Sequence, residues 1–178
     1  MSRVNTDTAK VPAASQDLLS QINQAFGTTP NMFKAVANST AALKSMWGSF
    51  AALGQGSLGA KLGEQIAVAI ANQNQCEYCL AAHTLLGQKA GASAAEMAEA
   101  KVGSSADAKT AAALAFALKV VGQRAQVSAE DVSALRKAGF NDEQIVEIMA
   151  HVALNVFTNY INVALDVPVD FPKVALSA

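Results

Sequence analysis

Hydrophobic residues recur three and four positions apart along most of this chain, which is the spacing of one face of an α-helix. For example, one face of residues 15–26 carries Leu18, Leu19, Ile22 and Phe26. Strict alternation of polar and apolar residues, which is typical of strands, does not extend over any useful length, so we predict no sheet. With capping residues included, the pattern predicts helices over residues 15–26, 31–37, 39–52, 58–73, 76–90, 93–101, 106–122, 128–139 and 141–165.

The composition agrees with a helical fold. Apolar residues make up 52% of the 178 residues and only four are proline, while abundant alanine favours helix. A chain of this length is long enough for one domain with a substantial core. We therefore predict an all-α, compact helical bundle with no sheet. Residues 1–14 are predicted to form a flexible N-terminal arm, and residues 15–178 a single all-helical domain.

Two further features bear on the architecture. The tripeptide Glu-Gln-Ile at residues 64–66 recurs at residues 143–145. So weak a match leaves open that the bundle consists of two similar helical halves, of which only the first carries reactive side chains. Near the end of the chain, Pro168 and Pro172 cannot continue a helix, so we predict an extended tail.

The charge and hydrophobicity of the chain argue against nucleic-acid binding and against a membrane-spanning protein. The chain carries 13 basic and 14 acidic residues without a basic patch, so nucleic acid is not expected as a partner. Its apolar runs are too short to span a membrane, and the first residues lack the apolar segment of a signal peptide, so a cytoplasmic location is expected. So few charged residues suggest that some surface is buried between subunits of a homo-oligomer.

The reactive side chains gather in one stretch. Cys76, Cys79 and His83 follow one another at three- and four-residue spacing, and Glu64 stands twelve residues before Cys76. If a helix begins near Cys76, these three residues share a face. The helix N-terminus and the histidine can then favour the thiolate of a cysteine, and the second cysteine can form a disulfide with the first once it is oxidised. Glu64 could orient the imidazole of His83 from a neighbouring helix.

Other interpretations of this stretch remain open. Two cysteines and a histidine make a partial zinc site with Glu64 as a possible fourth ligand, but structural zinc sites usually take four Cys or His ligands. The ligand count therefore argues against a metal site. The two cysteines could also be small buried hydrophobic residues without a reactive role. In a reducing compartment, however, a Cys-x2-Cys pair is more often catalytic or metal-binding than structural.

Two residues outside the stretch are weaker candidates. Trp47 could line a pocket, but an aromatic residue at helical spacing is more often part of the core. His151, one turn after Glu147, could be a remote catalytic partner, although a hydrogen-bonded structural histidine is the more common case. The roles of His151 and of Tyr78, between the cysteines, stay open.

The positions of Glu64, Cys76, Cys79 and His83 resemble the active-site signature of the alkylhydroperoxidase D group, in the carboxymuconolactone decarboxylase-like superfamily. The segments 155–162 and 170–172 also resemble the peroxidase-related branch of that superfamily. The chain departs from its relatives twice. Tyr78 stands where some members have a histidine between the cysteines, and Val163 stands where many in the branch have a histidine.

The resemblance implies a thiol-dependent peroxidase that reduces hydroperoxides and is regenerated by a protein or small-molecule dithiol. It implies Cys79 as the nucleophile, Cys76 as the resolving cysteine, and Glu64 with His83 as the proton relay. A homo-oligomer, a trimer or hexamer, is also implied, and neither a metal nor another cofactor is expected to be needed. Two alternatives stand beside this: a carboxymuconolactone decarboxylase-like enzyme, which would not need the cysteine pair, and a non-enzymatic protein that uses the disulfide as a redox switch.

Overall fold

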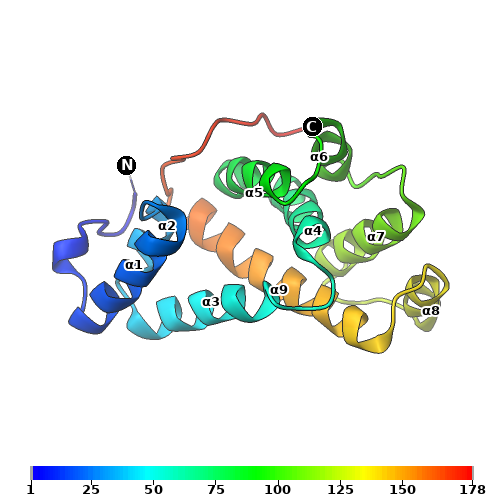
Figure 1. Ribbon diagram of the computed structural model, residues 1–178, viewed down its shortest axis with the longest axis horizontal. Helices are drawn as coiled ribbons and strands as arrows, with labels where there is room; N and C mark the ends of the chain where they lie inside the picture. The colour runs from blue at the N-terminus through cyan, green and yellow to red at the C-terminus, as the bar shows by residue number, and fades with distance from the viewer. Residues whose placement is uncertain (1, 178) are drawn as a thin grey trace.

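The computed structural model describes residues 2–177. These residues form helices and no strand, which confirms the predicted all-α fold (Figure 1). The helices are η1 (Thr8–Lys10, a 3-10 turn), α1 (Ala13–Phe26), α2 (Asn31–Val36), α3 (Thr40–Leu53), α4 (Ala60–Gln73), α5 (Glu77–Lys89), α6 (Ala94–Lys101), α7 (Ala108–Gly122), α8 (Ala129–Lys137) and α9 (Asp142–Ala164). Helix α1 begins at Ala13, earlier than the predicted Ser15, because Pro12 directly precedes the helix and its fixed φ angle suits that position.

Side chains that bind the first free N–H groups determine where the later helices begin. Ser93, Ser128 and Asn141 each accept a hydrogen bond from the backbone three residues on, and the side chain at that third position bonds back to the cap. Each such capping box satisfies two backbone donors that would otherwise lack partners. These starts are local in origin, which is why the sequence predicts them well.

Helix α4 is the centre of the bundle. It packs against α5, α6, α7 and α9, and every residue from Gln65 to Ala71 is buried. A helix that is apolar nearly all round has to be enclosed by others. Because α5 follows α4 after a short break and packs against it, the residues on these two helices face one another closely.

Helix α9 crosses the molecule beside α3 and α4 (Figure 1). Its first half buries Ile145, Ile148 and Val152. Its second half instead buries a polar stripe, which consists of Asn155, Thr158, Asn159 and Asn162. Polar groups are costly to bury without hydrogen-bond partners, and two atoms of this stripe, Asn159 Nδ2 and Asn162 Oδ1, have none among the described residues.

The segment after α9 is not helical, as predicted, and runs across the top of the view in Figure 1 past α5 to α6. Backbone and side-chain hydrogen bonds hold it: the carboxylate of Asp170 accepts from Asn31 N–H at 2.8 Å, and Ser177 N–H donates to the Asn72 side chain at 2.8 Å. At the other end of the chain, Arg3 N–H donates to the Leu165 carbonyl at 2.8 Å. The flexibility of residues 1–14 and the single-domain division stay predictions, and Met1 and Ala178 lie outside the described residues.

The short sequence repeat does not correspond to a repeated helix pattern. Residues 64–85 are divided between α4 and α5, whereas residues 143–164 lie within the single helix α9. The difference arises at residues 74–76, where the chain leaves the helical conformation and Gln75 adopts a φ of 55°. As for membranes, no helix among the described residues has the length and apolar character needed to cross one.

The core position of Ile148 gives a test of this packing. Its side chain is fully buried, so we expect Ile148→Ala to lower the free energy of unfolding by about 2–5 kcal/mol and Ile148→Val by about 0.5–1.5 kcal/mol. Urea denaturation followed by circular dichroism measures both. A loss that does not grow with the number of deleted methyl groups would contradict the packing of α9.

Candidate active site

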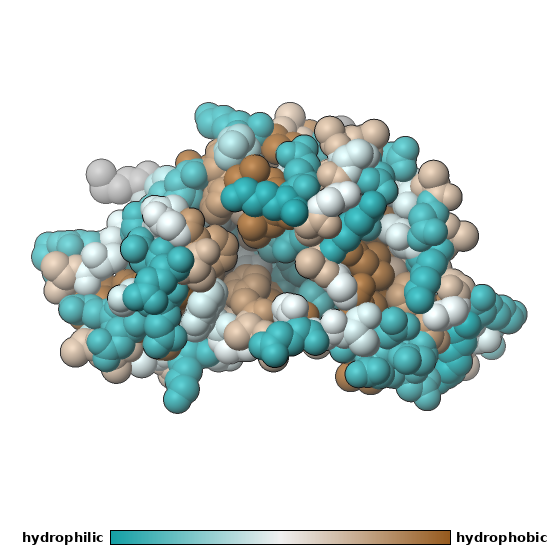
Figure 2. All heavy atoms as spheres, in the orientation of Figure 1, coloured by the Kyte–Doolittle hydropathy of each residue, from teal (hydrophilic) through white to brown (hydrophobic). Residues whose placement is uncertain are grey.

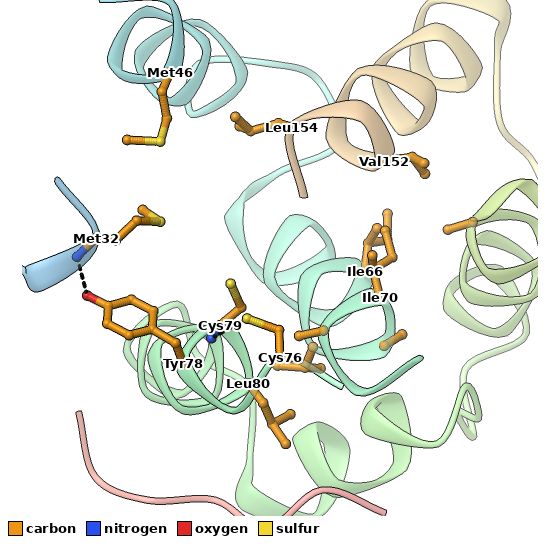
Figure 3. Close-up of a cluster of buried hydrophobic side chains, with 14 of the residues drawn as sticks. Met32, Met46, Ile66, Ile70, Cys76, Tyr78, Cys79, Leu80, Val152 and Leu154 are labelled. Carbon is orange, nitrogen blue, oxygen red and sulfur yellow. Dashed lines mark hydrogen bonds between the residues drawn. The ribbon is translucent and has the colours of Figure 1, made fainter. Parts of the chain in front are cut away.

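The break between α4 and α5 positions the two cysteines. Cys76 is the N-cap of α5, and its Sγ accepts a hydrogen bond from Cys79 N–H at 3.3 Å. This confirms a helix start at Cys76 and places the two residues one turn apart. The side chains lie next to one another in Figure 3, and both are free and buried, with exposed fractions of 1% and 2%. The structure therefore holds a reduced pair of neighbouring thiols.

Glu64 and His83 meet across α4 and α5. Glu64 Oε2 lies 2.7 Å from His83 Nδ1, and His83 is buried. Burial lowers the pKa of His83, but the Glu64 carboxylate raises it by more, so the pKa lies above its ordinary value. The pair leaves the Nε2 side of the ring free of protein hydrogen bonds among the described residues, and a protonated ring can donate there.

The third element at the site is α9, which sequence reasoning did not assign a role. Asn162 Nδ2 donates to Cys79 Sγ at 3.1 Å and lies 3.3 Å from Met32 Sδ. Beside it, Asn159 Oδ1 accepts from Asn74 Nδ2 at 3.0 Å. The polar stripe repeats at three- and four-residue spacing on a helix that is otherwise apolar on its buried side, and this pattern is the signal that could have identified it.

The two thiols differ in acidity. Burial raises the pKa of Cys79, but the polar side chains around its sulfur, Cys76 first and then Asn162, Asn159 and Thr158, outweigh it, so the net shift is downward. The pKa of Cys76 is raised, chiefly by its hydrogen bond with Cys79 and by burial, while His83 lowers it by less. Cys79 is therefore the thiol that ionises first. The groups that favour its thiolate are Cys76 and side chains of α9, whereas His83 acts on Cys76.

A cavity of about 250 Å³ opens beside Cys79. Its walls are predominantly apolar and come from five helices and the C-terminal tail; they include Phe26, Met32, Phe33, Phe50, Tyr78, Leu86 and Phe171. Cys79, His83 and Glu64 also border it, but Cys76 does not. Figure 2 shows a recess with hydrophobic walls in the middle of this face, between the elements that line the cavity. Cys79 is therefore the cysteine that a ligand entering here would meet.

Tyr78 and Trp47 shape this cavity in different ways. The hydroxyl of Tyr78 accepts from Met32 N–H at 3.2 Å (Figure 3), and its ring packs edge-on against Phe171 at 5.5 Å between centroids. Tyr78 thus joins α5 to α2 and to the tail. Trp47 does not border the cavity but packs edge-on against Phe33, 5.9 Å away. It is a half-buried residue that packs against the core behind the cavity wall, in keeping with its helical spacing.

The residues of this site lie in a segment that matches a known protein family. Residues 35–123, half of the chain, match the carboxymuconolactone decarboxylase family. This chain belongs to that family. The segment contains Glu64, both cysteines and His83, so the predicted resemblance is confirmed. No match was found among curated proteins.

Solved structures share the whole fold. One is described as an alkylhydroperoxidase AhpD core, an uncharacterized peroxidase-related protein from Ralstonia eutropha JMP134, with 26% identity, a TM-score of 0.86, and 95% of this chain and 92% of that chain covered. An uncharacterized peroxidase-related protein from Silicibacter sp. TM1040 has 24% identity and a TM-score of 0.82 over 98% and 92%. The debrominase Bmp8 has 20% identity and a TM-score of 0.75 over 89% and 87%.

His151 lies behind the Glu64–His83 pair. A second cavity of about 100 Å³ shares Phe50, Glu64 and His83 with the first and is also bordered by His151. Burial lowers the pKa of His151, so the ring is mostly neutral near pH 7. The ring of His151 packs against Gly63. A Cβ added at Gly63 would lie 2.9 Å from the ring. Among the described residues, no cluster of three or more His, Cys, Asp or Glu side chains has the arrangement of a metal site.

The Glu64–His83 pair predicts a pH-dependent contribution to stability. Because the pKa of His83 is raised in the folded chain from 6.5, the stabilisation is complete below about pH 6.5 and is lost as the pH rises through the folded-state pKa. We expect Glu64→Gln to lower the free energy of unfolding by about 1.5–3 kcal/mol near pH 6, and by less near pH 9.

Denaturant titrations at both pH values measure this difference. Glu99→Gln is the matched control, since Glu99 is exposed on α6 and its substitution should cost less than about 0.5 kcal/mol at either pH. If Glu64→Gln cost the same at both pH values, the charged pair would not exist in solution.

Proposed function

We propose that this chain is a thiol-dependent hydroperoxide reductase that cycles between the two thiols and a Cys76–Cys79 disulfide. One observation carries the proposal: two neighbouring thiols are buried together, but only Cys79 borders the apolar cavity. Family membership and the likeness to a peroxidase-related structure at 26% identity support the same activity. The apolar walls favour an organic hydroperoxide over hydrogen peroxide.

The first step is attack by the Cys79 thiolate on the terminal oxygen of the hydroperoxide. The O–O bond breaks, a Cys79 sulfenic acid forms, and the alkoxide leaves as the alcohol. His83 supplies the proton that the alkoxide takes, having received the proton that Cys79 lost on ionisation. Its pairing with Glu64 holds the ring beside the cavity and raises its pKa, so that the ring carries this proton near neutral pH.

The second step forms the disulfide. The Cys76 sulfur attacks the sulfur of the Cys79 sulfenic acid and expels hydroxide, which leaves as water with the Cys76 proton. Overall, one hydroperoxide and two thiols give one alcohol, one water and one disulfide. The raised pKa of Cys76 keeps it protonated while Cys79 is ionised, so that the two cysteines do not compete for peroxide. Cys76 also lies away from the cavity, behind the sulfur that it resolves.

A protein or small-molecule dithiol is proposed to reduce the disulfide again by thiol–disulfide exchange. The homo-oligomer of three or six chains and the cytoplasmic location also stay predictions. Exposed apolar side chains on α9, namely Val146, Tyr160 and Val163, are in keeping with a subunit interface. Decarboxylase chemistry explains neither the neighbouring thiols nor the lowered pKa of Cys79, so we rank it below the peroxidase.

The order of the two cysteines can be tested with single variants. In Cys76→Ser, one equivalent of cumene hydroperoxide should oxidise Cys79 to a sulfenic acid that persists and can be trapped with dimedone, because no resolving thiol remains. Tandem mass spectrometry of the labelled peptide locates the adduct. The matched variant Cys79→Ser should consume no peroxide. An adduct at Cys76 in Cys79→Ser, with none at Cys79 in Cys76→Ser, would reverse the assignment.

Turnover separates an enzyme from a redox switch. With excess dithiothreitol, the unaltered chain should consume many equivalents of hydroperoxide, whereas a switch would consume one and stop.

Reductive debromination of a small aromatic ring is a second candidate function, since the debrominase Bmp8 shares the fold and aromatic side chains dominate the cavity walls. There, the two thiols and a carbon–bromine bond would give a disulfide, a carbon–hydrogen bond, bromide and a proton.

A bromide assay distinguishes the two candidates. A related structure of Bmp8 contains 2,3,4-tribromopyrrole, which makes this compound a suitable probe. We expect cumene hydroperoxide to be turned over and bromide release from the pyrrole to stay at the level of Cys79→Ser. Debromination would be favoured if bromide were released faster than peroxide is consumed. This release would have to require both cysteines.

A further inference from the structure

We infer that Asn162 is a catalytic residue whose side-chain amide binds the thiolate of Cys79. The inference rests on the proposed function only in naming Cys79 as the reacting thiol. Nothing in the cysteine motif predicts such a group, because Asn162 comes eighty-three residues after Cys79, on another helix.

The amide of Asn162 is directed at sulfur on both sides. Its Nδ2 lies 3.1 Å from Cys79 Sγ and 3.3 Å from Met32 Sδ. A thioether can only accept a hydrogen bond, so the geometry uses the amide as a donor to both atoms. The residue is 3% exposed, and water therefore does not compete strongly for these contacts.

The side-chain oxygen of Asn162 shows that directing the nitrogen at the sulfurs has a cost in stability. Asn162 Oδ1 is buried and has no hydrogen-bond partner among the described residues. An asparagine retained only for packing or for its helix would be expected to satisfy its carbonyl oxygen, because an orphaned buried acceptor is destabilising. Here the oxygen is left unsatisfied while the nitrogen contacts the sulfurs, which is the pattern expected where binding the thiolate matters more than stability.

Neighbouring residues on α9 reinforce this contact. Asn159 Nδ2 also lacks a hydrogen-bond partner among the described residues, and its oxygen is held by Asn74 at 3.0 Å. Asn159 and Thr158 both lower the pKa of Cys79, as Asn162 does. The second half of α9 therefore surrounds the sulfur with neutral polar groups, of which Asn162 donates to it, and Asn74, at the α4–α5 connection, holds Asn159 in place.

Neutral donors suit a nucleophilic thiolate in a buried place. An anion away from water needs hydrogen bonds or an opposite charge, and the charged His83 is directed at Glu64 and acts on Cys76. Amide donors stabilise the anion and leave the cavity side of the sulfur open to substrate, since Asn162 does not border the cavity. The positive charge at His83 then remains available for the leaving alkoxide.

The test measures the acidity of Cys79 rather than turnover. In the full-length chain carrying Cys76→Ser, the thiolate absorbance at about 240 nm and the rate of iodoacetamide alkylation are followed against pH. Asn162→Leu keeps the side-chain volume but removes the donor. We expect the midpoint of the Cys79 thiolate titration to rise by about one pH unit, with about tenfold slower alkylation below that midpoint. Asn162→Ala serves as the second variant should the leucine not fold.

Asn155→Leu is the matched control. Asn155 is an equally buried asparagine on α9, but its amide donates at 2.9 Å to the carbonyl of His151 on its own helix, so its loss should leave the midpoint unchanged. The inference is overturned if folded Asn162 variants keep the original midpoint, or if Asn155→Leu shifts it equally. A shifted midpoint in a chain that consumes no peroxide would refute the proposed function and leave the thiolate contact standing.

Discussion

The hydrogen bond from Cys79 N–H to Cys76 Sγ is the interaction on which the site depends. It makes a thiol the N-cap of α5, a place more often taken by serine, threonine, asparagine or aspartate. One contact thereby starts the helix and brings the two sulfurs together. The packing of α5 against α4 then brings His83 to Glu64. The cost is a weaker cap than an oxygen would give, and the polar residues that precede Cys76 help to interrupt the chain at this point.

The buried polar stripe of α9 carries a cost in stability. Two of its amide atoms, Asn159 Nδ2 and Asn162 Oδ1, lack hydrogen-bond partners among the described residues. Each orphaned group destabilises the fold, and the compensation comes from the first half of α9, where Ile145, Ile148 and Val152 are buried. The helix thus has an apolar half that packs into the core and a half whose buried side is mostly polar and contacts Cys79 through Asn162.

The segments that carried the family resemblance meet in space although they are far apart in the sequence. Asn159 and Asn162 approach the cysteines from α9, while Phe171 reaches the ring of Tyr78 from the tail. Asp170 secures that tail by accepting from the N–H of Asn31 at the start of α2. Val163, where many members of the branch are expected to have a histidine, is 49% exposed. Tyr78, where some members are expected to have one, has a hydroxyl that joins α5 to α2.

The sequence by itself determined the elements whose causes are local. Capping boxes and helical periodicity placed the helices, and the spacing of Cys76, Cys79 and His83 on one helix placed the predicted reactive residues. Only the tertiary structure decided that Asn162, rather than His83, contacts the Cys79 sulfur, and that Cys79, rather than Cys76, borders a cavity. Both outcomes depend on how α9, α2 and the tail pack against α5. Such long-range packing follows from the shape of the whole core, and no local pattern in the chain encodes it.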